Sequence, residues 1–333
     1  MNEHISLAHG NGGRLMRQLI DELFTPLLYH DPQQAQLDAA PLALPAGEVM
    51  ISTDAFTVKP LEFPGGNIGS LAIHGTVNDL AVSGATPHSL SLNAIIEEGL
   101  PIEQLRRLIE AMAIAAQHSG VRIVCGDTKV VARGEGSGLY LATTGIGVRP
   151  AGLALGMGQI QAGDKILVSG PVGDHGTAVM LAREAFGLRG DLQSDAASVL
   201  PLTQALLGMD GLRFMRDPTR GGLATVMHEI ALTTGLDIGL QEEAIPIRPA
   251  VRSVCEILGY EPLYLACEGR VVAVVAAEQA EAALMAWQGL PDGEQAAMIG
   301  EVREGQGMVV MQTPLGGERL LAELEQEPLP RIC

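Results

Sequence analysis

The chain has 333 residues, more than one hydrophobic core usually serves, so two domains of ordinary size are expected. Hydrophobic residues make up 47% of the chain but aromatic residues only 3%, which argues against a base-stacking surface for single-stranded nucleic acid. A formal charge of -18, with 21 lysine and arginine residues, argues against duplex DNA or RNA as a partner.

Cysteine usage indicates a cytoplasmic protein. The four cysteines form no CxxC pair and no dense cluster, so neither a zinc ribbon nor a disulfide scaffold is predicted. The N-terminus lacks the basic and apolar regions of a signal peptide, and no apolar run approaches twenty residues. We therefore expect no membrane insertion, and an inert core position for three of the thiols: Cys125, Cys255 and Cys267.

Apolar side chains recur at the helical period over residues 14–28, which predicts a helix. A glycine-dense run, HGNGG at residues 9–13, precedes it. Backbone N–H groups of Gly12 and Gly13 at this helix start could hold an anion, although such a run is often only a turn.

Residues 49–58 have the composition of a strand, and Asp54 interrupts it where packing would favour an apolar residue. A turn and then a helix of small residues are predicted at 63–83. Its periodicity puts Asp79 near the buried stripe, where the alternative is a capping aspartate. Asn67 either orients a phosphate or carboxamide with its side-chain amide or caps this helix.

Residues 102–118 are predicted to form an amphipathic helix. A strand is predicted at residues 121–131, yet its centre carries the polar run GDTK. Lys129 is one of only three lysines, and it follows Asp127 and Thr128 directly. A lysine next to an aspartate and a threonine favours a nucleotide site, in which Lys129 contacts phosphate oxygens and Asp127 binds a metal ion. The alternative is a salt-bridged lysine at a strand end.

The second half begins near residue 162 with a strand at 164–169, a donor-rich turn at 170–176 and a helix at 177–186. Later, RDPTRGG at 216–222 leads into another helix. Neither a Walker A motif nor a kinase HRD or DFG triplet is present, so any ATP site is of another type. Four carboxylates could converge on hydrated Mg²⁺ and a triphosphate: Asp54, Asp79, Asp127 and Asp217.

Cys333 ends the chain on a tail that two prolines bias towards an extended conformation, giving a reach of roughly 20 Å over seven residues. Such a tail suits delivery of a sulfur atom to a distant pocket, although termini tolerate many residues. Glu268, between two apolar runs, is a candidate general base at a strand edge, where burial would raise its pKa. The alternative is a turn carboxylate exposed to water.

These motifs together, ending in PRIC at residues 330–333, resemble the HypE family of carbamoyl dehydratases, which act in nickel–iron hydrogenase maturation. The resemblance spans nearly the whole chain and implies an α/β (α+β) fold of the PurM-like superfamily. It further implies an N-terminal dimerising mixed-sheet domain at 1–150, a C-terminal α/β domain at 151–318 and a flexible tail at 319–333.

The resemblance also implies a mechanism. The carbamoyltransferase HypF loads a carboxamide onto Cys333, and ATP with Mg²⁺ drives its dehydration to a thiocyanate, which supplies cyanide to a HypC–HypD iron scaffold. Cys333, Lys129, Glu268 and Asp79 are then the catalytic residues, with Glu268 as the base. The same resemblance implies a homodimer and a nucleotide site built from Asp54, Asn67, Asp79, Asp127, Thr128, Lys129, Asp217, Gly12 and Gly13, with the four aspartates holding the metal.

Two alternatives remain open from the sequence. A small-molecule kinase or ATP-dependent synthetase of the same superfamily would survive loss of Cys333. A non-catalytic carrier, which only presents the terminal thiol to maturation factors, would still hand on its cargo without Lys129 or Glu268.

Overall fold

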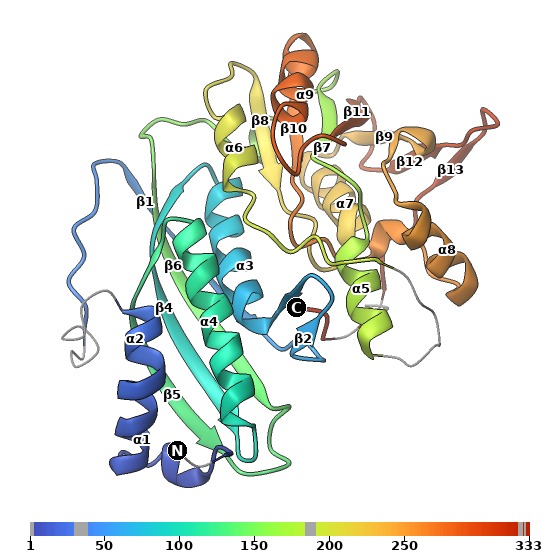
Figure 1. Ribbon diagram of the computed structural model, residues 1–333. Helices are drawn as coiled ribbons and strands as arrows, with labels where there is room; N and C mark the ends of the chain where they lie inside the picture. The colour runs from blue at the N-terminus through green and yellow to red at the C-terminus, as the bar shows by residue number, and fades with distance from the viewer. Residues whose placement is uncertain (1–2, 30–38, 184–190, 326–328, 330) are drawn as a thin grey trace. The chain divides into compact units, whose positions relative to one another are not determined.

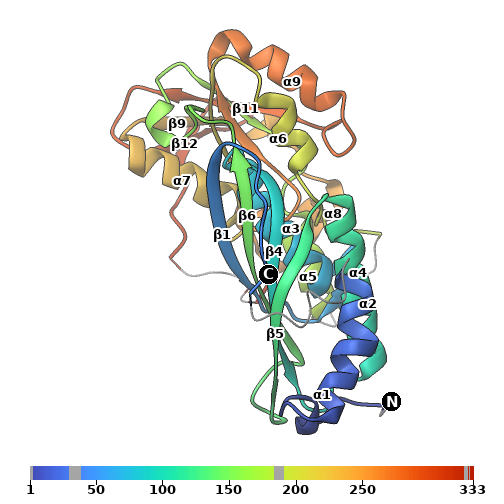
Figure 2. The ribbon, with the colours of Figure 1, turned by 90° about the vertical axis from the view of Figure 1, so that its left-hand side faces the viewer.

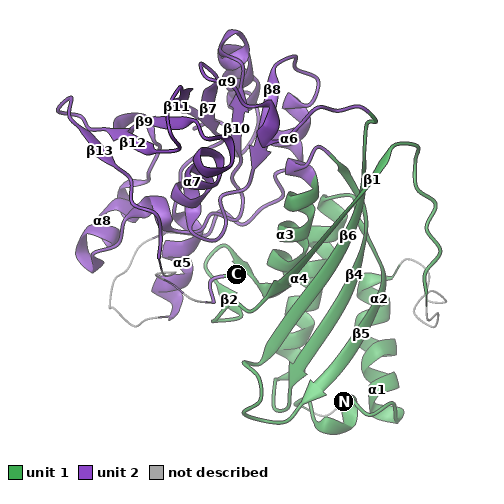
Figure 3. Ribbon diagram, turned by 180° about the vertical axis from the view of Figure 1, so that it is seen from behind, with its two compact units in different colours: residues 1–80, 85–151, 333 green, residues 81–84, 152–332 purple. Residues whose placement is uncertain are grey.

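The computed structural model describes residues 3–29, 39–183, 191–325, 329 and 331–333. The chain divides into two compact units, shown in different colours in Figure 3. Unit 1 comprises Met1–Leu80, Ala85–Ala151 and Cys333, and unit 2 comprises Ala81–Gly84 and Gly152–Ile332.

Unit 1 is built on a four-stranded sheet in the order β1-β6-β4-β5 (Figure 1). Strand β6 runs antiparallel to both β1 and β4, whereas β4 and β5 are parallel. Because parallel neighbours need a crossover, helix α4 connects β4 to β5. The elements are η1 (Leu7–His9), α1 (Arg14–Leu19), η2 (Ile20–Phe24), α2 (Thr25–Leu28), β1 (Glu48–Phe56), β2 (Glu62–Phe63), β3 (Gly66–Asn67), α3 (Ile68–Val82), β4 (Thr86–Glu97), α4 (Ile102–His118), β5 (Arg122–Val131) and β6 (Leu139–Arg149).

Helices α3 and α4 lie on one face of this sheet (Figure 2). Alternation along the strands follows from that cover, because successive side chains point to opposite faces. Phe56, Leu92 and Leu141 are buried, whereas Val49 and Ile51 on β1 remain 55% and 70% exposed. Within the described part of unit 1, the second face of the sheet therefore presents aliphatic side chains to solvent.

The helix predicted at residues 14–28 is confirmed, with one π-helical stretch, η2, between α1 and α2. The predicted helix at 102–118 coincides with α4, and the predicted strand at 121–131 differs from β5 by one residue. These elements carry strong periodicity, which is the sequence signal least affected by tertiary context.

Unit 2 is built on a seven-stranded sheet in the order β13-β12-β9-β11-β7-β10-β8. All its pairs are antiparallel except β12 with β9. The elements are η4 (Met157–Gln159), β7 (Lys165–Val168), α5 (Asp174–Arg183), α6 (Leu200–Leu206), β8 (Leu212–Arg216), α7 (Gly222–Thr234), β9 (Asp237–Gln241), η5 (Glu242–Ala244), α8 (Pro249–Leu258), η6 (Pro262–Tyr264), β10 (Val272–Val275), η7 (Ala277–Gln279), α9 (Ala280–Gln288), β11 (Ala297–Arg303), β12 (Val309–Gln312) and β13 (Glu318–Leu320).

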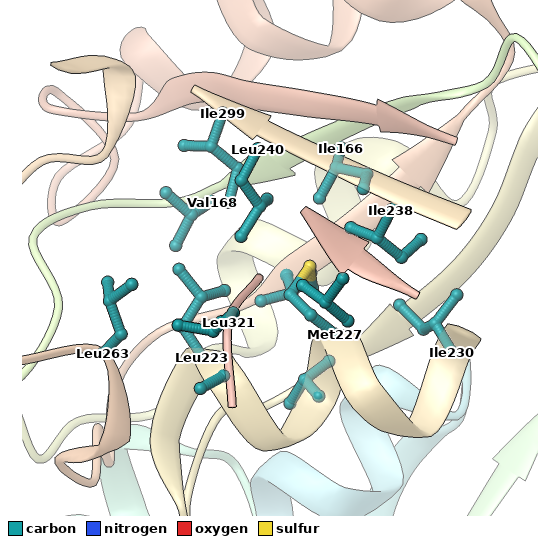
Figure 4. Packing of buried hydrophobic residues seen from close by; sticks show 14 of the residues in the cluster. Ile166, Val168, Leu223, Met227, Ile230, Ile238, Leu240, Leu263, Ile299 and Leu321 are labelled. Carbon is teal, nitrogen blue, oxygen red and sulfur yellow. The ribbon is translucent and has the colours of Figure 1, made fainter. Parts of the chain in front are cut away.

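Both faces of the second sheet are covered, and each has its own core. Ile166 and Val168 pack with Leu223 and Met227 of α7 (Figure 4). Leu167, between them in sequence, packs instead with α6 and α9, next to Trp287. The buried central strands therefore read as continuous apolar runs, as expected when helices lie on both sides.

Trp287, the single tryptophan of the chain, is fully buried in the second of these cores. Its indole Nε1–H donates to the carbonyl oxygen of Leu202 at 2.9 Å, which ties α9 to α6. A buried indole requires such a partner, because an unpaired N–H loses its hydrogen bond to water.

Two predicted boundaries were wrong. Helix α5 begins at Asp174, three residues before the predicted start, and the end predicted at residue 186 lies outside the described residues. The apolar run before Cys267 forms no strand: it contains the short helix η6 and then an irregular segment. Glu268 therefore precedes strand β10 rather than joining two strands. In the described part of the chain, no helix has the length and apolar character needed to cross a bilayer.

Candidate functional site

Two of the predicted aspartates lie on the helix-covered face of the sheet in unit 1. Ser52 Oγ on β1 donates to Asp79 Oδ2 on α3 at 2.6 Å, while Asp54 Oδ1 accepts from the backbone N–H of Ala55 at 2.8 Å. A Cβ built at Gly75 would lie 3.5 Å from Asp54 Oδ2. Because Gly75 and Asp79 are four residues apart on α3, the two carboxylates line neighbouring turns of one helix stripe.

Glycine is required at position 75 by this packing. A Cβ there would approach the ring of Phe56 to 2.7 Å. The absence of a side chain lets α3 approach β1 closely, which brings Asp54 and Asp79 towards the same stripe.

Asn67 caps helix α3. Its Oδ1 accepts from the backbone N–H groups of Gly69 at 2.9 Å and Ser70 at 3.1 Å. The capping alternative is thus confirmed, and these two bonds use the amide oxygen only, so a role of the Nδ2 group towards a phosphate stays a prediction.

Asp127 and Lys129 lie on the other, helix-free face of the sheet. The Lys129 ammonium contacts Asp127 Oδ2 at 2.9 Å, and the two side chains are 64% and 54% exposed. This hydrogen bond lowers the pKa of Asp127. Thr128, between them, points to the covered face and is buried. The strand is thus buried on one face only, and the pairing expected in the alternative of a salt-bridged lysine is found on its exposed face.

The glycine loop before α1 is open. Gly12 has φ of 73°, in the left-handed region that favours glycine, and Gly13 is the N-cap residue. A Cβ at either position would meet no atom within 4 Å. Their predicted contact with a nucleotide stays a prediction.

The predicted four-carboxylate cluster is not assembled among the described residues, where no group of three or more His, Cys, Asp or Glu side chains could hold a metal ion. Asp54 on β1 and Asp79 on α3 lie on the helix-covered side of the sheet, and Asp127 lies on its opposite face. Asp217 belongs to unit 2, where it is 6% exposed. Convergence of the four on one cation stays a prediction.

Glu268 is buried in unit 2, at 2% exposure. The alternative of a water-exposed turn carboxylate was therefore wrong. The backbone on each side of it is held in place: Cys267 N–H donates to the Pro218 carbonyl at 3.0 Å, and Gly269 N–H donates to Asp195 Oδ2 at 3.1 Å. The first of these bonds ties Glu268 to the segment that contains Asp217.

Asp195, which the sequence did not point to, organises this part of unit 2. Its Oδ1 accepts from the backbone N–H of His175 at 3.0 Å, and its Oδ2 lies 3.6 Å from the Arg270 guanidinium. A Cβ at Gly269 would collide with the Asp195 carbonyl oxygen. One carboxylate thus fixes the start of α5 and the turn after Glu268 together. Its surroundings in the sequence, QSDAA, carry no motif that would have revealed it.

An open pocket of about 640 Å³ lies beside this network, lined among others by Asp174, Arg248 and Arg270. Asp174 Oδ2 accepts from Arg248 Nε at 2.7 Å, whereas Oδ1 has no hydrogen-bond partner among the described atoms. Burial raises the pKa of Asp174 to about 6, against the opposing effect of Arg248.

Of the three cysteines expected at inert core positions, two are buried and one is not. Cys255 and Cys267 are buried, and burial raises the pKa of each thiol, to about 11 for Cys255. Cys125 is only half-buried, because it lies on the helix-free face of β5 and not in the core. Cys333 groups with unit 1, where its carbonyl oxygen accepts from the backbone N–H of Thr57 at 3.1 Å and from Thr57 Oγ1 at 3.3 Å.

Comparison with known proteins matches each half of the chain to a domain family. Residues 36–149 match the AIR synthase related protein N-terminal domain, and residues 161–312 match its C-terminal domain. The carbamoyl dehydratase HypE of Azotobacter vinelandii is 46% identical over 334 residues, covering 100% of this chain and 98% of that protein. The chain belongs to the HypE family. The resemblance inferred from the motifs is confirmed, as is the PurM-like α/β fold.

Solved HypE structures share the whole fold. A crystal structure of HypE in complex with ATP has 45% identity and a TM-score of 0.93, covering 98% of this chain and 99% of that one. HypE in a HypE–HypF complex has 42% identity and a TM-score of 0.81, covering 92% of this chain and 99% of that one. Members of the HypE family have thus been seen with a nucleotide and with HypF.

Proposed function

We propose that this HypE-family chain is an ATP-dependent carbamoyl dehydratase of hydrogenase maturation, which converts an S-carboxamide on Cys333 into an S-thiocyanate. The observation that carries the proposal is the full-length similarity to carbamoyl dehydratases. The identity is 46%, over 100% of this chain and 98% of the relative. The terminal Cys333 supplies the thiol that such a carboxamide requires.

The chemistry balances around one carbon atom. The amide oxygen of the carboxamide takes the γ-phosphoryl group of ATP, which turns that oxygen into a leaving group. Two protons leave the nitrogen, the C–O bond breaks, and phosphate departs as the carbon–nitrogen triple bond forms. The net change is loss of water from the carboxamide at the expense of ATP.

Lys129 and Glu268 have the chemical properties these steps need. Lys129 carries a positive charge on an exposed side chain, and it would offset charge on the transferred phosphoryl group. Glu268 is a buried carboxylate, and a carboxylate within hydrogen-bond reach of the nitrogen would accept its protons as a general base. Asp79 would orient the phosphates through the metal.

Asp54 and Asp79 fit a magnesium ion bound together with ATP. Carboxylate oxygens are the ligands that Mg²⁺ prefers, and it usually keeps several waters and takes only one or two carboxylates in addition to phosphate oxygens. Asp79 on α3 and Asp54 on β1, which faces the neighbouring turn of α3 at Gly75, supply two such carboxylates. When bound, the ion would neutralise phosphate charge. Asp127, Thr128, Asp217, Asn67, Gly12 and Gly13 complete the proposed nucleotide site.

The partners follow from the same proposal. HypF would load the carboxamide, as the HypE–HypF complex of a relative suggests, and a HypC–HypD complex would accept the cyanide. We place these steps in the cytoplasm, in keeping with scattered cysteines that form no disulfide framework.

The helix-free face of unit 1 supports a homodimer. Val49, Ile51 and Ile95 on this face are 55%, 70% and 40% exposed. The register pairs Val49 with Val148 and Ile51 with Ile146, so neighbouring strands place their side chains side by side. A second copy would cover this aliphatic surface by the same residues across a twofold axis.

The test is the mass of the C-terminal peptide, residues 326–333, after incubation with HypF and its substrates, with and without Mg-ATP. A carboxamide adduct on Cys333 that loses one water only when ATP is consumed is the expected result. An unmodified Cys333 despite ATP consumption by this chain would favour a small-molecule kinase.

Variants separate the remaining alternative. Lys129→Met and Glu268→Gln should retain the carboxamide but fail to dehydrate it, whereas Cys333→Ser should take no carboxamide at all. If the first two variants still pass cyanide to the acceptor, the chain is a non-catalytic carrier. Arg252→Ala, on the exposed side of α8, is the matched control and should behave as wild type.

A further inference from the structure

Arg331 and Ile332, which precede Cys333, are bound to unit 2 through their backbone. His175 Nε2 lies 2.8 Å from the carbonyl oxygen of Ile332, and the Arg183 guanidinium donates to the carbonyl oxygen of Arg331. Both donors belong to helix α5. The Ile332 side chain is 3% exposed, and that of Leu329 is 8% exposed.

The chemistry of these contacts fixes the state of His175. A carbonyl oxygen can only accept, so the proton must be on Nε2, and Nδ1 then accepts from the Ser194 hydroxyl at 2.8 Å. Ser194 Oγ in turn accepts from the backbone N–H of Ala196 at 3.0 Å. Complete burial lowers the pKa of His175, which keeps the ring neutral and this single tautomer in place.

The backbone of Arg331 shows that the bound conformation is specific. Its φ is 57°, in the left-handed region that residues other than glycine rarely adopt. Such a conformation costs about 1 kcal/mol and persists where surrounding contacts determine it. The two carbonyl contacts and the buried Ile332 side chain are those contacts.

We propose that His175, oriented by Ser194, and Arg183 form a latch that holds the tail by its backbone carbonyls, and that opening this latch frees Cys333 to receive its carboxamide. This inference rests on the proposed function for its purpose. We name these three residues the α5 latch. His175 and Arg183 are positioning residues, because they hold the peptide groups next to Cys333 rather than the reacting atoms.

A second attachment, nearer the body of unit 2, defines how far the thiol can travel. The Ala322 carbonyl accepts from Tyr264 Oη at 2.6 Å and lies 3.1 Å from His228 Nε2. If this attachment stays closed while the α5 latch opens, the eleven residues after Ala322 can extend over roughly 35 Å. The thiol can then leave without disturbing β13 or the sheet.

Both donors bind carbonyl groups, and the buried Ile332 side chain adds a contact that does not involve sulfur, so the chemical state of the thiol does not decide the strength of the latch. A free thiol, a carboxamide and a thiocyanate would be held equally well by the same two donors. Delivery and release would therefore depend on competition by a partner for the tail, and not on recognition of the cargo by α5.

The experiment measures how fast Cys333 reacts with a bulky maleimide in the full-length protein, without ATP or HypF, read from the mass of the peptide of residues 326–333. Because Cys333 is half-buried, a bulky reagent needs a released tail, and the rate then follows the released fraction. Loss of one hydrogen bond should raise that rate about threefold to tenfold in His175→Phe, and towards the lower end of that range in Arg183→Ala, whose bond to Arg331 is exposed.

His175→Gln is the rescue variant, because a glutamine amide presents an N–H donor at a reach similar to that of histidine Nε2. It should react nearly as slowly as wild type, as should the control Arg252→Ala on α8. Should His175→Phe fail to fold, Arg183→Ala alone decides, since this side chain is only half-buried. Wild-type rates in both folded latch variants, or a His175→Gln rate as fast as that of His175→Phe, would overturn the proposal.

The maleimide rate involves neither nucleotide nor carboxamide. A chain that fails to dehydrate its carboxamide but shows the expected rates has the latch without the proposed activity. A dehydratase with wild-type rates in every variant has the activity without the latch.

Discussion

Asp174 is a buried carboxyl group in an environment that opposes its negative charge. It is 1% exposed, and its Oδ1 has no hydrogen-bond partner among the described atoms. Arg248 and Arg270 offset part of the cost, and Asp195 adds to it. The balance is a pKa raised to about 6, from an ordinary value of 3.8.

This raised pKa gives a pH dependence with a definite sign. The native state binds the Asp174 proton more tightly than the unfolded state does. The stabilisation of the native state by this proton is therefore complete below about pH 3.8 and is lost as pH rises through about 6. The free energy of unfolding should therefore fall by roughly 1–3 kcal/mol from this group between pH 4 and 6. Urea unfolding of wild type and Asp174→Asn at pH 4, 5, 6 and 7 measures it as the difference between the two profiles.

The matched control is Asp191→Asn, an exposed carboxyl group that lines the same pocket. Its profile should follow that of wild type. Parallel profiles for wild type and Asp174→Asn would show that burial does not perturb Asp174.

At the scale of elements, a hydrogen bond connects strand β1 to helix α3 in unit 1. Ser52 Oγ on β1 donates to Asp79 Oδ2 on α3 at 2.6 Å. A hydrogen bond of this kind orients a carboxylate that binds a cation, and its removal commonly weakens metal binding tenfold or more.

We expect Ser52→Ala to weaken Mg-ATP binding by roughly tenfold, because the Asp79 carboxylate loses its orientation while its charge is kept. Isothermal titration of the purified variant with Mg-ATP measures the dissociation constant. Thr53→Ala is the control, since the next side chain on β1 points to the opposite face and bonds to Thr143 and Thr144 instead. Equal affinities in the two variants would remove Asp79 from the nucleotide site.

Elements with a regular pattern were the part of the fold that the sequence could predict. Residues 102–118 repeat apolar positions over four turns, so both ends of α4 were placed correctly. The irregular turns were harder. The apolar run before Glu268 was expected to be a strand, but it contains η6 and an irregular segment. Bonds to residues far away in the sequence hold that segment: the Ala266 carbonyl accepts from Gly176 N–H, and Cys267 N–H donates to the Pro218 carbonyl.

At the scale of the whole molecule, the helix-free sheet face predicts assembly. Ile51→Glu places a charge within this aliphatic surface, where burial against a second copy would desolvate it. We expect the variant to sediment as a monomer at concentrations where wild type is a dimer. Analytical ultracentrifugation over a concentration series checks this outcome.

Leu232→Glu on α7 is a matched control, because Leu232 is similarly exposed, at 63% against 70% for Ile51. It should sediment as wild type does. If Ile51→Glu and wild type have the same mass, the exposed face is not the surface between copies.

The candidate site shows what sequence alone can and cannot supply. The motifs identified candidate site residues, including Asp54, Asp79 and Lys129, because carboxylate and ammonium groups can be recognised from the sequence alone. The sequence did not show which face of β5 Lys129 occupies, since a single bulge between Leu90 and Ser91 changes the pairing of β4 with β5. Nor did it indicate Asp195 or the donors on α5 that hold the tail. Their side chains bind backbone groups of distant segments, and such partners leave no motif in the sequence.

Trp287 has a consequence for spectroscopy. As the single tryptophan, it makes emission excited at the red edge of the absorption band a signal of unit 2 alone. Its buried indole should emit at short wavelength and shift to the red when that unit opens, whereas unit 1 can melt without a change in the signal. A fluorescence transition that differs from the circular dichroism transition would therefore separate the stabilities of the two units within one intact chain.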